Sequence, residues 1–350
     1  MDSWKRARAI LDGAGIVPGR LARVRPLSGG TYNTVEELVL TDGSRCVLKT
    51  APDAPGLRYE SRLLVSEAEF YRRAEEAGVP APRLLALGDD NTTLLMTACP
   101  GTPWDGSLSE AEQAGLRAEL GRQVAVLHRV TGPAFGYPSG ALGPLAADWR
   151  TAFTGMLDAV LDDAHRFAAG LPRPAAEIGR GLRAAYDALD EVTVPALVHF
   201  DLWRGNVLVE RPAESARPAE SARSAESARS AESADPADPV RSADQVRIGG
   251  LIDGERMLWG DPLADFVSLA LLGDIKKDEA FLAGYREADG RTDFDTPALL
   301  RLALYRAYLY LIMLVETVPR RMGEDALRWR EEAVAPQLVE ALDEIREATS

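Results

Sequence analysis

Three polar residues in the second half of the chain have the types and order that phosphoryl transfer requires. Asp201 and Asn206 lie in the segment HFDLWRGN, between two short apolar runs, and Asp253 follows another apolar run. In phosphoryl transfer one carboxylate accepts the proton of the attacking hydroxyl, while an amide and a second carboxylate hold the magnesium ion that bridges the phosphates. The order along the chain predicts Asp201 as the catalytic base and Asn206 and Asp253 as magnesium ligands.

These motifs resemble those of a known family, the aminoglycoside phosphotransferase-like small-molecule kinases, which include fructosamine, choline and homoserine kinases. The resemblance rests on the segments HFDLWRGN (199–206), ID (252–253) and GDPLADF (260–266). It implies the same roles for Asp201, Asn206 and Asp253, and it adds Asp265 as a buried residue that supports the catalytic loop. It covers nearly the whole chain except the first fifteen or so residues and a repetitive segment.

Two positions depart from the family pattern. Phe200 stands where a glycine is usual, and Gly254 follows Asp253 where an aromatic residue is common. Neither change removes a chemical group that the reaction needs. A single Asp or Asn near a strand end is usually a turn former or a helix cap, so the prediction depends on all the elements occurring in order. His199 is predicted to be structural, its ring tying the loop to neighbouring backbone.

An ATP site should lie upstream of these motifs. Ser28, Gly29, Gly30 and Thr31 form a glycine-containing turn between two strand-like runs, and Lys49 ends the next strand-like run. Paired glycines let backbone amides approach phosphates closely, and a lysine neutralises the phosphates that are not transferred. The turn taken alone is equally compatible with an ordinary hairpin.

A predicted helix over residues 66–77 follows Lys49 and ends at Gly78. It offers acidic partners that could hold the lysine in place. The family resemblance selects Glu67, although Glu69 is close enough in the sequence to compete. Most glutamates on such a helix face solvent.

The segment after the next two predicted strands has the position of a hinge between two lobes. Strand-like runs over 82–87 and 92–96 precede Thr97, Ala98 and Cys99. These three residues are predicted to recognise adenine through their backbone. A plain interlobe linker is compatible with the same position.

The predicted fold is α+β, a protein-kinase-like two-lobed fold with a small antiparallel β-sheet lobe and a larger, mainly helical lobe. Residues 1–98 form the predicted ATP-binding lobe, and residues 99–350 form the predicted catalytic and acceptor-binding lobe. Helices are expected over 297–318 and 326–348, among others. The longest apolar run, 307–315, is too short to span a bilayer and should be a buried helix.

The net charge of −14 is unevenly distributed. Residues 1–96 contain 13 basic and 13 acidic residues, so the excess acid lies in the predicted acceptor lobe. This argues against a nucleic acid partner and fits a small cationic acceptor, although an acidic surface also serves solubility. We expect no membrane partner and a cytoplasmic location, because the chain has no apolar leader and two separate cysteines. A monomer and a homodimer both remain open.

The expected activity is MgATP-dependent phosphorylation of a small-molecule hydroxyl. An aminoglycoside or amino sugar suits the acidic lobe, with Glu255 as a candidate contact. The segment DLWRGN (201–206) resembles the fructosamine kinase branch of the family, so a fructosamine is the alternative acceptor. A nucleotide-binding module without catalysis is a third possibility. The sequence leaves open whether GTP replaces ATP and whether the role is in antibiotic resistance or metabolism.

Residues 211–245 form a repetitive insertion. Glutamate recurs every six residues, at positions 214, 220, 226 and 232. This period matches neither a helix nor a strand, and large apolar residues are rare, so the segment is predicted to be disordered. A docking arm or lid is the alternative function for it.

Overall fold

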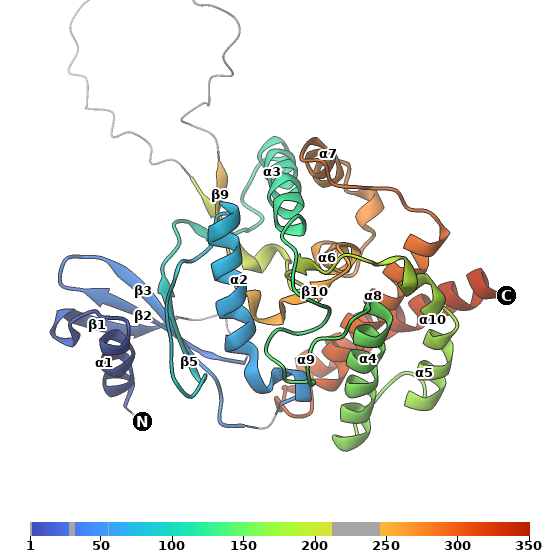
Figure 1. Ribbon diagram of the computed structural model, residues 1–350, viewed down its shortest axis with the longest axis horizontal. Helices are drawn as coiled ribbons and strands as arrows, with labels where there is room; N and C mark the ends of the chain where they lie inside the picture. Colours follow the sequence, from blue (N-terminus) through green and yellow to red (C-terminus); the bar gives the residue numbers. More distant parts are fainter. Residues whose placement is uncertain (1, 28–31, 55, 212–245) are drawn as a thin grey trace, which may run out of the picture.

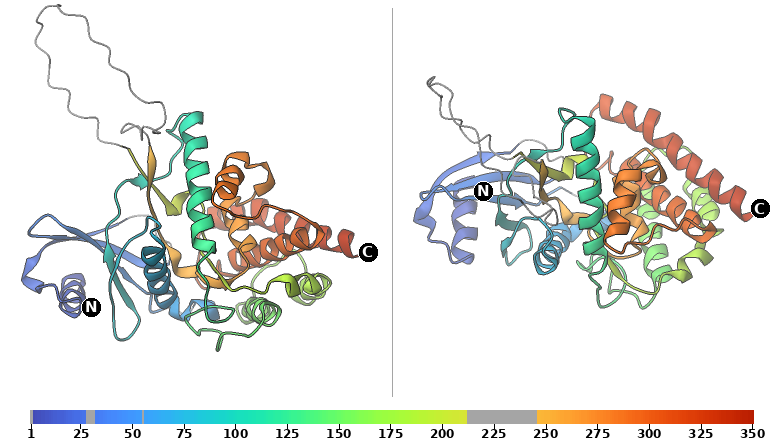
Figure 2. Two further views of the ribbon diagram at one scale, coloured as in Figure 1. Left: turned by 45° about the horizontal axis from the view of Figure 1, so that its top comes forward. Right: turned by 90° about the horizontal axis from the view of Figure 1, so that it is seen from above.

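The computed structural model describes residues 2–27, 32–54, 56–211 and 246–350. Two lobes lie side by side, a small one built around a β-sheet and a larger, mainly helical one that contains the C-terminus (Figures 1 and 2). The α+β two-lobed architecture expected from the sequence is therefore confirmed.

The small lobe is an antiparallel five-stranded sheet in the order β1-β2-β3-β5-β4. Its strands are β1 (Leu21–Pro26), β2 (Thr34–Leu40), β3 (Arg45–Thr50), β4 (Leu84–Leu87) and β5 (Thr93–Thr97). Because side chains alternate along a strand, β5 turns Leu95 to one face and Leu94 and Met96 to the other. Helix α1 (Ser3–Gly13) packs on the Leu95 face, and α2 (Leu63–Ala77) packs with the opposite face.

The core of the large lobe continues beneath α2. Phe70 and Tyr71 of α2 belong to the same apolar cluster as the helices of the large lobe, whereas α1 and most of the sheet form a separate cluster. Helix α2 ends at Gly78, which adopts a left-handed conformation with φ of 71°. The side of α2 that faces the large lobe is therefore fixed by packing between the lobes.

Helix α8 (Thr296–Val315) is the central helix of the large lobe. It is long and apolar enough to cross a membrane by length and composition, but 78% of its most apolar window is buried inside the protein. The expectation of a buried helix over 307–315 is confirmed. Of the other helices of the large lobe, α4 (Trp149–Arg166), α6 (Leu263–Leu269) and the C-terminal helix contact α8, while α3 (Glu110–His128) packs against α7 (Glu279–Glu287) and α5 (Ala175–Arg183) packs against α4.

The prediction of a helix over 326–348 is confirmed, and the structure adds a π-helical segment inside it. The structure contains α9 (Glu324–Trp329), a π-helical segment over Arg330–Val334 and α10 (Ala335–Thr349). Pro336 lies in the first turn of α10. Proline has no N–H for the bond to the preceding turn, and a wider π turn accommodates that loss.

Short strands connect the helices of the large lobe and position its loops. They are β6 (Thr102–Pro103), β7 (Ala196–Val198), β8 (Val207–Glu210), β9 (Arg247–Leu251) and β10 (Leu258–Gly260). Strands β8 and β9 pair antiparallel, with Val207 opposite Leu251 and Glu210 opposite Arg247. The ends of β7 and β9 and the start of β8 carry the polar residues singled out in the sequence.

Candidate active site

The loop of residues 199–206, between β7 and β8, is braced by a buried carboxylate. The backbone N–H groups of His199 and Phe200 donate to the two oxygens of Asp265, at 3.1 Å and 2.6 Å. Asp265 lies in α6 and is fully buried. Two backbone donors on one carboxylate fix the direction in which the chain enters the loop, and so the position of Asp201.

A second contact holds Asp265 itself. The Nε2 atom of His128, at the end of α3, lies 3.0 Å from Oδ2 of Asp265, and Nδ1 lies 2.7 Å from the hydroxyl of Tyr285. Because an ionised carboxylate can only accept, Nε2 donates in this pair. Burial opposes the charge of Asp265, but the hydrogen bond from His128 holds its pKa below the ordinary value.

The ring of His199 joins the loop to the segment after β9. Its Nε2 donates to the carbonyl of Ile252 at 3.0 Å, and its Nδ1 accepts from the N–H of Asp201 at 3.2 Å. The structure thus places His199 between Asp201 and the residue that precedes Asp253. Its ring also meets Phe70 of α2 edge to face, with centroids 4.8 Å apart.

Hydrogen bonds join Asn206 to Asp201 and to Ile252, the residue that precedes Asp253. The side-chain N–H of Asn206 donates to the backbone carbonyl of Asp201 at 2.8 Å, and the backbone carbonyl of Asn206 accepts from the N–H of Ile252 at 2.9 Å. The amide oxygen of Asn206 is therefore its candidate ligand atom. Asp253 has a left-handed conformation with φ of 65°, and 35% of its side chain is exposed. Two oxygen donors, one of them charged, are what Mg²⁺ prefers.

Lys49 meets Glu67 at the interface of the lobes. Its Nζ lies 2.8 Å and 2.9 Å from the two carboxylate oxygens of Glu67, and it also contacts Asp253. Burial works against the charge of Lys49, but the carboxylates of Asp253 and Glu67 raise its pKa well above the ordinary value. Glu69, the competing candidate, instead pairs with Arg73 on the same helix at 2.8 Å.

Tyr71 links the lysine pair to the metal candidate, and the sequence analysis did not select it. Its hydroxyl donates to Glu67 at 2.6 Å and accepts from the N–H of Asp253 at 3.2 Å. Its spacing of four residues from Glu67 places the two side chains on one face of α2. That spacing was the signal available in the sequence.

Glu255 is placed among the carboxylates around Lys49. Its oxygen lies 3.5 Å from the Lys49 Nζ and accepts from the side-chain amide of Asn33. It is 6% exposed, and burial together with the nearby Asp253 raises its pKa well above the ordinary value. This position faces the lysine, and a contact between Glu255 and the acceptor stays a prediction.

Oxygen atoms of three carboxylates, from Glu67, Asp253 and Glu255, lie within 4.8 Å of one another. Lys49 can neutralise only one carboxylate charge, and the raised pKa of Glu255 shows that further negative charge is unfavourable there without another cation. A largely buried group of carboxylates of this kind suits a divalent cation that prefers oxygen ligands. The residues present therefore fit a magnesium ion.

The two departures from the family pattern have local structural reasons. Phe200 occupies a left-handed conformation with φ of 62°, which explains why glycine is usual there. At Gly254, an added Cβ would lie 2.3 Å from the Cδ1 atom of Phe70. The aromatic ring at this place thus comes from α2 rather than from the residue after Asp253.

Within the described residues, Asp201 forms an ion pair with Arg256. The Nε atom of Arg256 lies 3.8 Å from Oδ2 of Asp201, and the side chain of Arg256 is 9% exposed. Burial raises the pKa of Asp201, and the charge of Arg256 opposes that rise. Arg256 is not among the residues predicted from the sequence, because an arginine after the metal-binding motif has no local signature.

Only some of the other residues predicted to bind the nucleotide lie in the described parts of the chain. Ser28, Gly29, Gly30 and Thr31 lie outside the described residues. Thr97 ends β5, and the N–H of Ala98 donates to the carbonyl of Arg45 at 3.2 Å. Burial raises the pKa of Cys99 to about 11, so this thiol is protonated at neutral pH.

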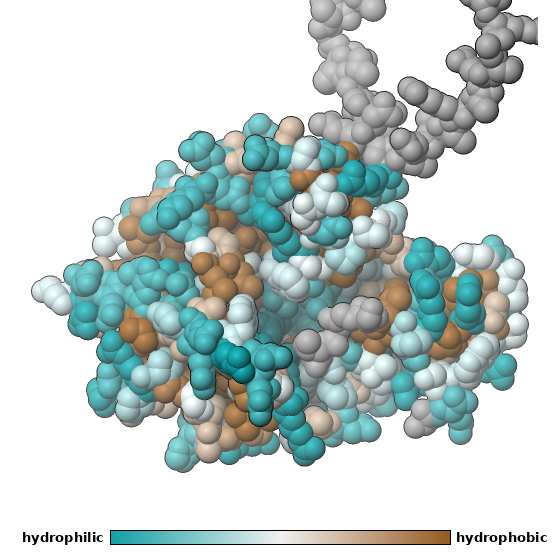
Figure 3. All heavy atoms as spheres, turned by 180° about the vertical axis from the view of Figure 1, so that it is seen from behind, coloured by the Kyte–Doolittle hydropathy of each residue, from teal (hydrophilic) through white to brown (hydrophobic). Residues whose placement is uncertain are grey.

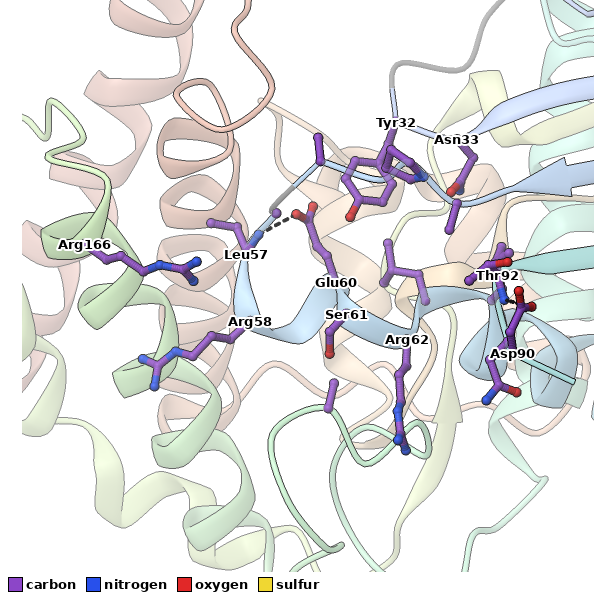
Figure 4. Close-up of a pocket in the computed structure, with 18 residues that line it drawn as sticks. Tyr32, Asn33, Leu57, Arg58, Glu60, Ser61, Arg62, Asp90, Thr92 and Arg166 are labelled. Atoms are coloured by element: carbon purple, nitrogen blue, oxygen red, sulfur yellow. Dashed lines mark hydrogen bonds between the residues drawn. The ribbon is translucent and has the colours of Figure 1, made fainter. Parts of the chain in front are cut away.

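The molecular surface is hollowed between the two lobes (Figure 3). A cavity of about 540 Å³ lies beside the lysine cluster, and its lining includes Tyr32, Asn33, Glu60 and Arg166 (Figure 4). Asn33 connects the two, because its side chain donates to Glu255. The cavity is therefore adjacent to the carboxylate cluster on the small-lobe side.

Comparison with protein families gives one match. The model of the phosphotransferase enzyme family matches residues 23–216 and 240–304 of this chain. No curated protein matches the sequence.

Several solved structures are similar to this one. A candidate fructosamine-3-kinase from Thermobifida fusca has a TM-score of 0.62 at 20% identity, with 99% of each chain covered. Another candidate fructosamine-3-kinase, from Haemophilus somnus, has a TM-score of 0.59 at 14% identity, covering 96% of this chain and 97% of that one. A thermostable aminoglycoside phosphotransferase mutant, crystallised with ADP and hygromycin B, has a TM-score of 0.56 at 15% identity, covering 95% and 96%. At these identities the likeness shows a shared fold.

Proposed function

The chain belongs to the phosphotransferase enzyme family, and from this premise we propose that it transfers the terminal phosphate of ATP to a hydroxyl group of a small molecule. The observation that carries the proposal is a set of contacts, through side chains and backbone, that brings together residues from separated segments. Lys49 contacts Asp253, the N–H of Ile252 bonds to Asn206, and Asn206 bonds to the carbonyl of Asp201. Phosphoryl transfer depends mainly on such positioning and on charge neutralisation.

In this reaction Asp201 orients the acceptor hydroxyl and takes its proton. The carboxylate is 23% exposed, so it is accessible to an acceptor, while the bonds from Asp265 to the loop hold its backbone. Lys49, held by Glu67, places its charge against the phosphates that stay with the nucleotide. Each of these contributions is electrostatic or positional, and a covalent enzyme intermediate is unnecessary.

Asn206 and Asp253 are the residues that would hold Mg²⁺, and Glu255 is close enough to Asp253 to take part. When bound, the ion supplies positive charge to the phosphate oxygens. The carboxylates around Lys49 would then be balanced by two cations instead of one. Removing Asp253 or Asn206 should therefore weaken the binding of Mg²⁺ more than the binding of free nucleotide.

We assign nucleotide binding to the small lobe, residues 1–98, and acceptor binding to residues 99–350. The assignment of Ser28–Thr31 to the phosphates and of Thr97–Cys99 to adenine rests on their positions in the sequence, before Lys49 and after β5. The Lys49 cluster supports it, because a lysine held by Glu67 offers a positive charge for phosphates bound between the lobes.

We propose an aminoglycoside or amino-sugar acceptor as the first candidate. The support is the excess of acid outside the balanced residues 1–96. The charged group that forms an ion pair with Asp201 is itself basic, since Nε of Arg256 lies 3.8 Å from Oδ2 of Asp201. The amino groups of such an acceptor would therefore lie away from the reacting hydroxyl.

A fructosamine-type acceptor is the second candidate. The segment DLWRGN resembles the fructosamine kinase branch, and two of the similar structures carry the name of candidate fructosamine-3-kinases. Both acceptor classes present a hydroxyl and an amine. They differ in the distance between these groups, so a panel of compounds can separate them.

The test is magnesium-dependent ATP consumption by the purified protein across aminoglycosides, amino sugars, fructosamines and small amino alcohols. We expect one class to stimulate turnover and Asp201→Asn to abolish it. Asp158→Asn, on an exposed face of α4, is the matched control and should behave like the natural protein. ATP binding without turnover for any compound would favour a non-catalytic nucleotide-binding module, and no ATP binding at all would overturn the proposal.

A further inference from the structure

A chain of buried ion pairs runs from the small lobe to the candidate catalytic base. Glu60 contacts Arg320, and the same Nη2 atom of Arg320 lies 3.1 Å from Glu316. Glu316 in turn accepts from Arg256 at 3.0 Å, and Arg256 lies 3.8 Å from Asp201. The five side chains alternate in charge along the whole path.

The members of this chain come from separate elements. Glu60 belongs to a short 3-10 helix within residues 1–98, η2 (Arg58–Arg62), which precedes α2 and packs against α4 of the large lobe through Arg58. Glu316 and Arg320 follow α8, and Arg256 ends the 3-10 helix η5 (Gly254–Arg256) after the metal candidate. The path therefore joins the two lobes close to the reacting groups.

Burial makes these contacts interdependent. The side chains of Glu60 and Glu316 are 0% and 3% exposed, and that of Arg320 is 9% exposed. Arg330 adds a further contact to Glu316 at 2.9 Å, so the cluster holds three acidic and three basic groups and is neutral overall. A buried ion that loses its partner is strongly disfavoured, so removing one charge should rearrange the others.

The small-lobe end of the path is fixed in place. The backbone N–H of Leu57 donates to Glu60 at 2.7 Å, and the guanidinium of Arg320 lies 4.8 Å from the centre of the Tyr32 ring. Figure 4 shows the Glu60 carboxylate between Leu57 and the ring of Tyr32. A Cβ at Gly56 would lie 2.4 Å from Oε2 of Glu60, so the backbone passes directly beside this carboxylate.

The geometry near Asp201 shows what the path can do. Arg256 is close enough to attract the Asp201 carboxylate, yet its shorter contact, at 3.0 Å, is with Glu316. Glu316 therefore keeps Arg256 from closing on Asp201. The carboxylate oxygens stay available for an acceptor hydroxyl only while this division of contacts holds.

We propose that Glu60 and Arg320 are positioning residues, which couple the placement of the small lobe to the orientation of the Asp201 carboxylate through Glu316 and Arg256. The inference rests on the proposed function, because it assigns these residues a role in the same reaction. When Glu60 is replaced by a neutral residue, Arg320 pairs with Glu316 alone. Glu316 then binds Arg256 less tightly, and Arg256 moves toward Asp201. Turnover should fall while nucleotide binding remains.

The experiment compares Glu60→Gln, Arg320→Gln and the double variant, using the acceptor that stimulates the natural protein. We expect each single change to lower kcat at least about tenfold and to change the KM for ATP less than about threefold. The kcat of the double variant should be no lower than that of either single variant, because both changes interrupt the same path. Arg320→Lys keeps the charge and should recover part of kcat.

Arg117→Gln is the matched control, since it removes a buried arginine that pairs with Asp278 between α3 and α7, away from the site. It should lower Tm without lowering kcat. If Glu60→Gln proves unfolded by circular dichroism, Glu60→Asp, whose shorter side chain weakens the contact with Arg320, takes its place with the same expected direction.

The outcomes separate the two levels of the proposal. No stimulated turnover in the natural protein would overturn the proposed function, and the inference with it. Normal turnover in the natural protein with an unchanged kcat in the Glu60 and Arg320 variants would overturn the inference alone. Losses of kcat that multiply in the double variant would show two independent structural effects and would also reject the common path.

Discussion

The backbone N–H of Phe200 donates to Oδ1 of Asp265 at 2.6 Å, and this bond sets a buried residue of α6 against the loop that carries Asp201. The second oxygen of Asp265 accepts from His199 and from His128. One carboxylate thus collects three donors, two of them from the loop. Position and stability of the loop depend on the same side chain.

Asp265→Asn should impair both stability and turnover. An amide offers one acceptor oxygen, so one backbone N–H of the loop would face an NH₂ group. We expect a loss of about 3 kcal/mol in the free energy of unfolding, measured in urea, and a fall of about a hundredfold in kcat. Asp274→Asn, at an exposed helix cap, is the control and should change neither by much. Unaltered kcat would contradict a positioning role for Asp265.

Phe200→Ala and Phe200→Gly should differ in a defined order. Both lose a ring that is 1% exposed and lies 5.6 Å from that of Tyr308, which should cost about 3–5 kcal/mol in unfolding free energy. Glycine tolerates the positive φ, whereas alanine retains the strain, so the glycine variant should be more stable by about 1 kcal/mol. Urea denaturation of both variants measures the order, and a more stable alanine variant would reject it.

Gly254→Ala should destabilise the protein by about 1–3 kcal/mol, because the new Cβ would overlap the ring of Phe70. The substitution Phe70→Leu should cost less in the Gly254→Ala background than in the natural protein, since it makes room for the methyl group. Gly155→Ala in α4 is the control, because a Cβ there meets nothing within 4 Å. Equal effects of Phe70→Leu in both backgrounds would argue against the overlap.

Tyr71→Phe removes one hydroxyl that contacts both Glu67 and the N–H of Asp253. We expect kcat/KM for ATP to fall about tenfold, because both the lysine partner and the metal candidate lose a fixed contact. Steady-state kinetics at varied ATP provides the measurement. Tyr310→Phe, which removes a hydroxyl that accepts from Leu272 in the large lobe, should leave kcat/KM unchanged; a similar fall there would point to a general packing effect.

Glu37 provides a prediction for the acid range. Burial works against its charge, but hydrogen bonds from Arg45 and Arg25 hold its pKa below the ordinary value. A lowered pKa in the folded state stabilises the protein above the unfolded pKa of about 4.3, and this contribution is lost as the pH falls through the folded value. Glu37→Gln should therefore be less stable than the natural protein by about 1 kcal/mol at pH 7, and the two should converge once the pH has fallen below the folded pKa of Glu37. A gap that stays constant with pH would contradict this.

The sequence could predict the polar groups of the site because their signals are local. Asp201, Asn206 and Asp253 follow one another at the ends of short apolar runs, and the structure has strands there. Helical periodicity could also have separated Glu67 from Glu69, because residues two positions apart lie on opposite faces of a helix. Phe70 and Tyr71, which are buried, mark the face toward Glu67.

Other features have no local signal. Glu60 and Arg320 are 260 positions apart, and each alone resembles an ordinary surface charge in the sequence. Their pairing follows from the way η2 and the end of α8 pack together. Helix α1 is a different case, because Asp2 caps it and Ala7, Ile10 and Leu11 form a buried stripe, so its signal was present.

Glu210 and Arg247 stand opposite each other where β8 ends and β9 begins, and their side chains form an ion pair at 2.7 Å. Strand pairing holds the end of β8 and the start of β9 about 5 Å apart. This spacing does not depend on the sequence that connects the two strands. The spot can therefore serve as an attachment point for protein engineering. A fluorescent reporter or an affinity tag whose own termini lie close together could be spliced between these strands, so that the fused partner would leave from the tip of a hairpin.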